Sequence, residues 1–383
     1  MNNFTFQNTT RIHFGEGQID KISRELPENS RVMMIYGGGS IKSNGLYNRI
    51  SKVFASRTWY EFSGIEANPQ YETLMEAVKQ VKLKRIDYLL AVGGGSVIDG
   101  AKFIAAAACY QGDDPWDILT KQQPVKKALP MGCVLTLPAT GTETNTGSVV
   151  TRDKNKLGFL SPKVRPTFAI LDPSITLSLS NRQIGNGVVD AFVHTMEQYL
   201  TYPVNAKVQD RFSEGLLMTL MEEGPVALVD KDNLETRGNI MWSATLALNG
   251  LIGAGVPQDW TTHMIGHELT GLFNVDHART LSILLPAVMQ FKRVEKQQKI
   301  LQYAARVLNI RSGDSEKIID EAIEKTKNFF IEMGLPTSFS DVDLSEEHIE
   351  TILNSLESHG MTSLGERGDI DIQNCHEILK LAL

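Results

Sequence analysis

An acid and four histidines in the second half of the chain offer ligands for a metal ion. Asp190 and His194 are four residues apart, as are His263 and His267, and His277 follows ten residues later. On a helix, side chains four residues apart share a face, so each pair could reach one point. One carboxylate with neutral imidazoles suits a first-row divalent cation such as Fe²⁺ or Zn²⁺. The spacing leaves two alternatives open: His263 and His267 both bind, or His277 replaces one of them and the spare histidine relays a proton.

The segment around Asp190 predicts a helix over 187–200. Its apolar side chains fall on one face, and Asp190, His194 and Glu197 form a stripe at the edge of that face. For an isolated Asp–His pair of this spacing, a hydrogen bond on the helix surface is the commoner outcome. The segment around His263 lacks the H-E-x-x-H order, so it does not place a glutamate base between two zinc ligands.

Two Gly-Gly-Gly-Ser turns in the first half of the chain favour a bound nucleotide. Gly37–Ser40 and Gly93–Ser96 each follow a short apolar run. Glycine lets the backbone approach a pyrophosphate, and the N-terminus of a following helix supplies N–H donors. Ser96 could cap that helix, and Asp99 in its first turn would complement the helix dipole. Neither turn is a G-x-G-x-x-G motif, and an ordinary tight turn explains either one alone, but two such turns at strand ends favour the nucleotide.

The first turn also carries a hint about which nucleotide binds. NAD-selective folds place an acid at a strand end to bind the ribose 2′-hydroxyl. No acid stands in the turn at Gly37, and Lys42 follows closely, which favours the 2′-phosphate of NADP(H). A third segment, Thr136–Asn145, is rich in hydroxyl groups and could close over the cofactor, although a plain polar loop is its ordinary explanation.

These segments fit a chain of two domains. At 383 residues the chain is too long for one ordinary core. Residues 1–180 alternate apolar runs with helical periods, which predicts an α/β, Rossmann-like domain with a mostly parallel sheet; residues 181–383 show helical periods throughout, which predicts an all-α domain. The boundary is expected within 172–182. The predicted strands are Arg31–Tyr36, Thr58–Phe62, Asp87–Val92, Met131–Leu137 and Thr167–Leu171, and the first predicted helices are Tyr71–Lys84 and one ending at Ala108.

Composition narrows the classes of partner. Hydrophobic residues make up 42% of the chain and charged residues 22%, as in soluble globular proteins. A net charge of −7 argues against nucleic acid and anionic membranes as partners. The first residues do not read as a signal peptide, and no apolar run approaches the ~20 residues of a membrane span. Three scattered cysteines are expected to be reduced thiols, so we expect a cytoplasmic protein.

Taken together, these motifs resemble the iron-containing (group III) alcohol dehydrogenases. The resemblance rests on Gly93-Gly-Gly-Ser-x-x-Asp99, Asp190-x₃-His194, His263-x₃-His267 and His277, and on Phe14-Gly-Glu-Gly17, and it runs over essentially the whole chain in the right order. The sequence of these segments is most similar to that of bacterial NADPH-dependent butanol dehydrogenases, also described as broad-range aldehyde reductases. It implies a dehydroquinate synthase-like architecture and a homodimer formed through the first strand.

The resemblance also implies roles for individual residues. The metal ligands would be Asp190, His194, His263 and His277, which leaves His267 beside the nicotinamide as a catalytic proton relay. NAD-specific relatives carry an aspartate at the position of Gly37. The residues expected to line NADP(H) are Gly37, Gly38, Gly39, Ser40, Asn68, Gly93, Gly94, Gly95, Ser96, Asp99, Thr136, Thr140, Thr142, Asn145 and Lys156.

The predicted function is reversible hydride transfer between NADP(H) and a primary alcohol or aldehyde, assisted by one divalent metal ion. A glycerol or other polyol dehydrogenase of the same fold is the nearest alternative. Glycerol dehydrogenase would use NAD, and the absence of an acid at Gly37 argues against NAD as the cofactor. A dehydroquinate synthase-like lyase is a remote alternative, because it needs several basic residues for a phosphorylated acid and the loops before His263 offer few. A metal-binding scaffold would leave both glycine turns unexplained.

Overall fold

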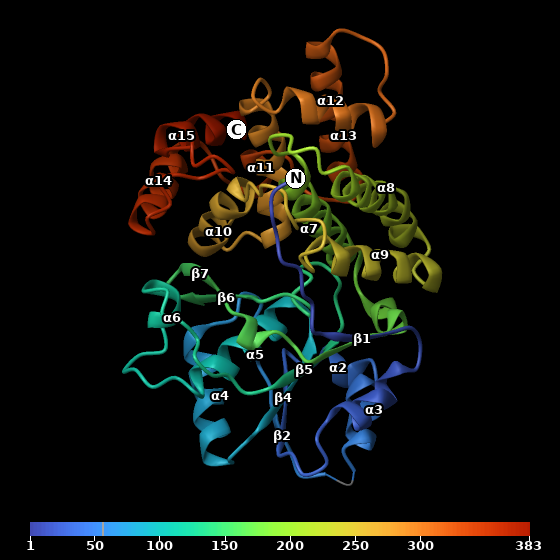
Figure 1. The fold of residues 1–383 in the computed structure, drawn as a ribbon, viewed down its shortest axis with the longest axis vertical. Helices are drawn as coiled ribbons and strands as arrows, with labels where there is room; N and C mark the ends of the chain where they lie inside the picture. The colour runs from blue at the N-terminus through green and yellow to red at the C-terminus, as the bar shows by residue number, and fades with distance from the viewer. Residues whose placement is uncertain (56) are drawn as a thin grey trace. The chain divides into compact units, whose positions relative to one another are not determined.

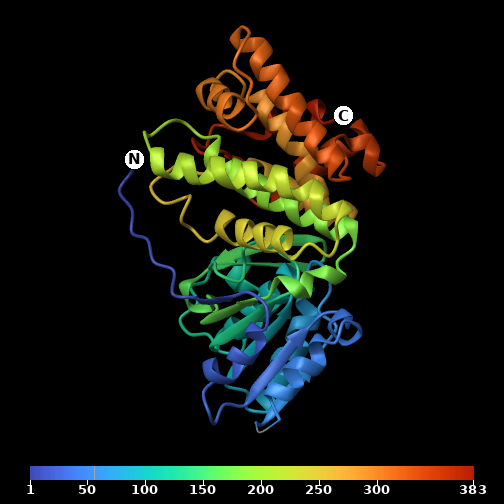
Figure 2. The same ribbon diagram turned by 90° about the vertical axis from the view of Figure 1, so that its right-hand side faces the viewer.

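The computed structural model describes residues 1–55 and 57–383 of the chain (Figures 1 and 2). These residues form two compact units. The α/β unit comprises residues 7–179 and 232–241, and the helical unit comprises residues 1–6, 180–231 and 242–383. The division into domains at residue 180 stays a prediction.

The α/β unit is built on a six-stranded parallel sheet. Its order is β1-β8-β5-β4-β2-β3, and every pair is parallel. All five strands predicted from the sequence are present within two residues of the expected bounds, and β1 adds an edge. Because β2 and β4 are neighbours, with Tyr36 opposite Val92, the two glycine turns leave the sheet side by side. The strands are β1 (Arg11–Phe14), β2 (Val32–Tyr36), β3 (Trp59–Phe62), β4 (Tyr88–Gly93), β5 (Met131–Leu135) and β8 (Phe168–Leu171).

Helices cover both faces of this sheet, which explains why its strands are continuous apolar runs rather than alternating ones. Met33 and Ile35 of β2 belong to the core that contains α4 and α5, whereas Val32 and Met34 belong to the core on the side of α3. Figure 1 shows α4 and α3 on opposite sides of the strands. The helices of this unit are α1 (Ile22–Glu25), α2 (Ser40–Ser43), α3 (Leu46–Val53), α4 (Tyr71–Leu83), α5 (Gly95–Ala107) and α6 (Asp117–Thr120), and short 3₁₀ turns are η1 (Gln18–Lys21), η2 (Pro162–Val164) and η3 (Pro173–Ser178).

A two-stranded antiparallel hairpin was not anticipated. It consists of β6 (Gly147–Arg152) and β7 (Asn155–Leu160), and it carries Lys156. Its two turn residues, Asp153 and Lys154, have positive φ angles of 49° and 68°. Two-residue hairpin turns with this backbone conformation usually have the sequence Asn-Gly or Asp-Gly. Because this turn contains no glycine, the sequence gives only a weak signal for it.

The second unit is helical, as predicted. Among the described residues after Leu171 there is no strand, only an isolated bridge between Leu364 and Ile370. No described helix is long and apolar enough to cross a membrane. The helices are α7 (Asn181–Tyr199), α8 (Lys207–Val229), α10 (Thr261–Phe273), α11 (His277–Phe291), α12 (Gln297–Arg306), α13 (Ser315–Glu332), α14 (Ile349–Ser358) and α15 (Ile372–Leu381), with 3₁₀ turns η4 (Phe339–Val342) and η5 (Glu346–His348); α9 (Leu234–Ala247) begins in the α/β unit.

Helix α7 is the central element of the helical unit. It begins with a capping box, in which Ser180 Oγ accepts from Gln183 N–H and Gln183 Oε1 accepts from Ser180 N–H. It packs against α8 and α11, and almost every residue from Ile184 onward is buried. Neighbouring helices enclose α7 and bury the stripe of Asp190, His194 and Glu197 as well, so the hydrogen bond on the helix surface that is the commoner outcome for an isolated Asp–His pair does not apply here.

A close helix contact supplies a test of this packing. A Cβ at Gly185 of α7 would lie 2.3 Å from the carbonyl oxygen of Met333 at the end of α13. We predict that Gly185→Ala lowers the free energy of unfolding by about 1–3 kcal/mol, because backbone must move to admit the methyl group. Urea denaturation followed by circular dichroism measures the change.

The matched control is Gly215→Ala on α8, where a Cβ would have no atom within 4 Å. There the better helix propensity of alanine should raise stability by up to about 1 kcal/mol. Equal stabilisation by both substitutions would contradict the close approach at Gly185.

Candidate functional site

Three helices of the helical unit bring an aspartate and three imidazoles to one point. Asp190 and His194 come from the middle of α7, His263 from the first turn of α10, and His277 from the first residue of α11. Asp190 Oδ1 lies 3.6 Å from His194 Nδ1, 4.0 Å from His263 Nε2 and 3.6 Å from His277 Nε2. Possible ligand atoms of Asp190, His263 and His277 all lie within 4.8 Å of one another.

These separations fit donors that share a metal ion better than donors that share protons. They exceed the ~2.7–3.2 Å of a hydrogen bond. Ligand atoms about 2.1 Å from a tetrahedral metal stand roughly 3.4 Å from each other, close to the two distances of 3.6 Å. The donor set, one carboxylate oxygen and imidazole nitrogens, is one that Fe²⁺ and Zn²⁺ both accept.

His194 carries the clearest unmet need for a ligand. Its Nδ1 is buried and has no hydrogen-bond partner among the described residues. Burial lowers the pKa of His194 to about 4, opposed by the charge of Asp190, so the imidazole is neutral at pH 7. A neutral imidazole nitrogen without a proton donor is the form that binds a divalent cation.

His267 lies beside this cluster. Its ring centre is 6.4 Å from that of His263 and 5.3 Å from that of His277, while the rings of His263 and His277 are 5.2 Å apart and those of His194 and His263 are 4.4 Å apart. The sequence left open whether His267 or His277 accompanies His263. The geometry brings His277 to Asp190.

The start of α10 is fixed by two buried carboxylates. Asp259 accepts a hydrogen bond from Thr261 N–H (3.0 Å), and Glu197 of α7 accepts one from Thr262 N–H (2.6 Å). The other oxygen of Glu197 is bonded to Nδ1 of His263. Burial raises the pKa of Glu197 well above its usual value, and the charge of Asp259 raises it further. The charge state of Glu197 therefore depends on the N–H groups and cations around it.

The start of α11 is fixed to α7 in a similar way. Asp276, directly before His277, accepts hydrogen bonds from Arg182 Nε (2.9 Å) and Asn186 Nδ2 (3.1 Å). Both partners lie on α7, one to two turns before Asp190. Side chains of α7 thus hold the two helix ends that carry His263 and His277.

In the α/β unit, the glycines of the second turn are required by protein packing. A Cβ at Gly93 would lie 2.5 Å from Val97, one at Gly94 would lie 3.1 Å from Leu137, and one at Gly95 would lie 2.7 Å from Thr140. The third loop therefore packs directly on this turn, and Thr136 N–H donates to Gly93 O (3.1 Å). Residues of two of the three predicted cofactor segments lie together here.

The first turn differs, because neither packing nor backbone conformation requires glycine at one of its positions. Gly38 is exposed, its φ is ordinary, and a Cβ there would meet no atom within 4 Å. Gly39, by contrast, has a φ of +101° at the start of α2. Open space at Gly38 is compatible with a ligand that must approach the backbone.

The surroundings of the first turn add an acid that lies outside it. Glu61 on β3 accepts a hydrogen bond from the hydroxyl of Tyr36 (3.0 Å). The ammonium of Lys42 lies over the rings of Tyr36 and Tyr47, 5.2 and 4.9 Å from their centres. The turn itself carries no acid, as the sequence indicated, and a cation is held close to it.

A buried lysine, which the sequence analysis did not single out, ties the third loop to α5. Lys102 Nζ donates to Thr142 Oγ1 (2.7 Å), Asn145 Oδ1 (2.9 Å) and Gly147 O (2.7 Å). Thr142 in turn donates to Asp99. Burial lowers the pKa of Lys102 to about 8, and the charge of Asp99 opposes this shift. Its position three residues after Asp99 is the only signal that the sequence held.

Two expectations about α5 are wrong. Ser96 does not cap the helix, because the helix already begins at Gly95; instead Ser96 Oγ accepts from Asn68 N–H (3.3 Å). Asp99 is not in the first turn, and its carboxylate accepts from Thr142 and from Val149 N–H (3.0 Å). Burial raises the pKa of Asp99, and the charges of Lys102 and of Lys156, which is buried on β7, oppose this shift.

Comparison with known proteins assigns the family. Residues 9–173 match the iron-containing alcohol dehydrogenases, and residues 185–366 match the C-terminal part of the Fe-containing alcohol dehydrogenase family. The chain belongs to the iron-containing alcohol dehydrogenase family. It is therefore an oxidoreductase, as the resemblance of its motifs predicted.

Members of this family resemble the chain over its full length. The NADPH-dependent aldehyde reductase YqhD of Escherichia coli (strain K12) is 54% identical over 386 residues, and the probable NADH-dependent butanol dehydrogenase 1 of Bacillus subtilis (strain 168) is 40% identical over 390 residues; both alignments cover all of both chains. A solved structure of the NADH-dependent butanol dehydrogenase A from Thermotoga maritima has a TM-score of 0.95 at 36% identity and covers 100% of this chain and 99% of that one.

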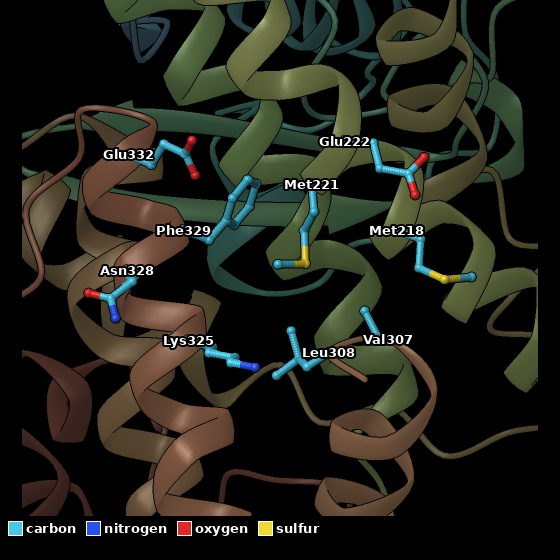
Figure 3. A pocket seen from close by; sticks show the side chains of 9 residues that line it. All are labelled: Met218, Met221, Glu222, Val307, Leu308, Lys325, Asn328, Phe329 and Glu332. Carbon is cyan, nitrogen blue, oxygen red and sulfur yellow. The ribbon is translucent and has the colours of Figure 1, made fainter. Parts of the chain in front are cut away.

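A separate hollow on the helical unit contains none of the predicted site residues (Figure 3). Its volume is about 340 Å³, and it lies among α8, the segment after α12, and α13. Met218, Met221 and Phe329 give it an apolar part, and Glu222, Lys325 and Glu332 are charged. Nothing in this lining resembles the ligand set around Asp190.

The lowered pKa of Lys102 gives a pH-dependent prediction. Between pH 8 and 10.5 the folded protein has released the proton of Lys102 while the unfolded chain still holds it, so unfolding takes up a proton and stability rises with pH. The unfolding free energy of the unmodified protein, minus that of Lys102→Met, should increase across this window by up to about 3 kcal/mol. Urea titrations of both proteins at several pH values measure it. If the difference in unfolding free energy between the two proteins does not change with pH, the pKa of Lys102 is not lowered in the folded protein.

Proposed function

We propose that this enzyme reduces aldehydes to primary alcohols with NADPH, reversibly, and that it needs one divalent metal ion, Fe²⁺ or Zn²⁺. The observation that carries the proposal is the convergence of Asp190 with three imidazole nitrogens at 3.6–4.0 Å. Support for the substrate and the cofactor comes from the 54% identical relative, whose name is NADPH-dependent aldehyde reductase.

In this proposal Asp190, His194, His263 and His277 hold the metal. A bound divalent cation would act as a Lewis acid toward the carbonyl oxygen of the aldehyde. His267, outside the ligand cluster, would deliver the proton that the alcohol oxygen requires, or remove it in the reverse direction. Aldehyde, NADPH and one proton are consumed, and alcohol and NADP⁺ are formed.

The nucleotide would lie on the turns of the α/β unit. We propose that Gly37–Ser40, Asn68, Gly93–Ser96 and the third loop approach it, with Asp99 and Lys156 as further cofactor residues. When bound, NADPH supplies the hydride, and the protein supplies position and electrostatics. Thr142, Asn145 and Asp99 are also bonded to Lys102 or to one another, and these bonds would hold the third loop in shape around the cofactor.

The remaining parts of the proposal concern the oligomeric state and the cellular location. We propose a homodimer, since β1 is an edge strand with a partner on one side only within the sheet, and such edges readily pair. A cytoplasmic location is supported by the three free cysteines.

The metal requirement is the direct test of the reaction class. Prolonged chelation should reduce the rate of NADPH-dependent reduction of a short-chain aldehyde by at least about 100-fold, because a Lewis acid contributes several kcal/mol to such a reaction. Added Zn²⁺ or Fe²⁺ should restore activity. His277→Ala should lose bound metal, whereas His267→Ala should retain metal and lose activity.

Elemental analysis of each protein is the control for this experiment. Full activity in protein shown to contain no metal would refute the proposal. A metal-free His267→Ala protein together with a metal-replete His277→Ala protein would reverse the two assignments.

The cofactor preference is tested at Gly37. The unmodified enzyme should prefer NADPH over NADH. In Gly37→Asp the new carboxylate should repel the 2′-phosphate and lower the NADPH-to-NADH ratio of kcat/KM about 10- to 100-fold, the worth of one charge pair in a partly wet site. Initial rates with each cofactor at one aldehyde concentration give the ratio.

Gly37→Asn is the matched control. A Cβ at Gly37 would lie 3.1 Å from Ile65 O, so any side chain crowds this position, and asparagine has the shape of aspartate without its charge. If the two variants have the same cofactor ratio, the turn does not sense the 2′-position by charge.

A further inference from the structure

Glu197 has an arrangement that no role assigned so far explains. It is a carboxylate in the middle of the helical unit, 3% exposed, on the same helix as Asp190 and His194. Its two oxygens are bonded to two neighbouring residues of α10: Oε1 accepts from Thr262 N–H at 2.6 Å, and Oε2 shares a hydrogen bond with Nδ1 of His263. One side chain of α7 therefore determines both where α10 begins and how the ring of His263 is turned.

From this arrangement we infer that Glu197 is a positioning residue for the metal centre, acting through His263. With Nδ1 of His263 donating to Glu197, the proton of the neutral ring is on Nδ1, and the lone pair is on Nε2. Nε2 is the atom that faces Asp190, at 4.0 Å. A carboxylate behind a ligating histidine fixes the ring and makes the imidazole a stronger donor. The inference rests on the proposed function, because it presupposes a metal at this cluster.

The surroundings of Glu197 hold it in place. Its backbone carbonyl accepts from Asp259 N–H (2.9 Å), and Asp259 caps Thr261. Asp259 is paired with the ammonium of Lys296, which also lies 3.3 Å from Glu366. Glu197 is therefore linked through Asp259 to a largely buried ion-pair network.

Glutamine at position 197 should disturb this arrangement with little change in volume. Its side chain has one acceptor and one donor, whereas Thr262 N–H and His263 Nδ1–H both need an acceptor. If the amide NH₂ faces Nδ1, the proton of His263 must move to Nε2, where it blocks the metal. If the NH₂ faces Thr262, two donors oppose each other at the start of α10.

The chain contains a matched control for a buried Glu–His pair. Glu268, also on α10, accepts from Nδ1 of His359 at 2.8 Å and is 3% exposed. His359 lies at the C-terminal end of α14 and has no part in the proposed ligand set. Glu268→Gln therefore breaks the same kind of bond in the same helical unit without touching a ligand.

The experiment compares Zn²⁺ affinity in full-length protein stripped of metal, by competition with a chelating dye. Glu197→Gln should weaken Zn²⁺ binding about 10- to 100-fold, and Glu268→Gln should change it less than about threefold. With Co²⁺ as the probe, the visible spectrum of saturated Glu197→Gln protein should differ from that of the unmodified protein, and that of Glu268→Gln should not. A purely structural role of Glu197 would lower the thermal stability of the metal-free protein and leave the Co²⁺ spectrum unchanged.

Glu197→Asp keeps the charge but shortens the reach, and it replaces Glu197→Gln if circular dichroism shows that the latter is unfolded; the same loss of affinity is expected. Zn²⁺ affinity within threefold of the unmodified protein, with an unchanged Co²⁺ spectrum, would overturn the inference. Failure of the unmodified protein itself to bind Zn²⁺, Fe²⁺ or Co²⁺ would overturn the proposed function instead, and the two failures are therefore distinct.

Discussion

The candidate metal centre depends on how α7 holds the first turns of two other helices. Asp190 and His194 are one turn apart on α7, which a single helix guarantees. His263 and His277 are not so constrained by local structure, since each is at a helix start that could pivot. Glu197 fixes the start of α10, and Arg182 and Asn186 fix the start of α11 through Asp276. The Glu197–Thr262 bond is buried and therefore expensive to break, because each group would be left without a partner, whereas the pair of Arg182 and Asp276 is exposed to solvent.

In the α/β unit, close packing holds the third loop against the second glycine turn. Glycines at 93–95 allow Val97, Leu137 and Thr140 to lie where a Cβ would otherwise be, so the third loop rests on the second turn. The buried ammonium of Lys102 then binds that loop at three acceptors. The first turn is less crowded, and its open position at Gly38 is where the structure leaves room for a ligand. The two turns that looked alike in sequence thus use glycine for different reasons.

Much of this could be predicted from the sequence, because the signals were local. The buried strands are short apolar runs that end at glycine, and the family motifs fixed the order of the segments. The hairpin of β6 and β7 escaped notice because its turn, Asp153-Lys154, has positive φ without glycine. The expected helix cap at Ser96 failed because the helix begins one residue earlier. The roles of Glu197 and Lys102 could not be assigned because their partners are distant in the sequence. The partners of Glu197 lie 65 and 66 residues away, and those of Lys102 lie 40 to 45 residues away.

The central claim is that Asp190, His194, His263 and His277 together hold one metal ion while His267 stands outside. It is tested most directly by anomalous X-ray scattering at the zinc and iron absorption edges, on crystals of protein shown to contain one equivalent of metal. The account predicts a single anomalous peak within about 2.3 Å of one atom from each of the four residues, with the ring of His267 beyond coordinating distance. A peak that His267 coordinates in place of any of the four, or a peak elsewhere on the chain, would contradict it.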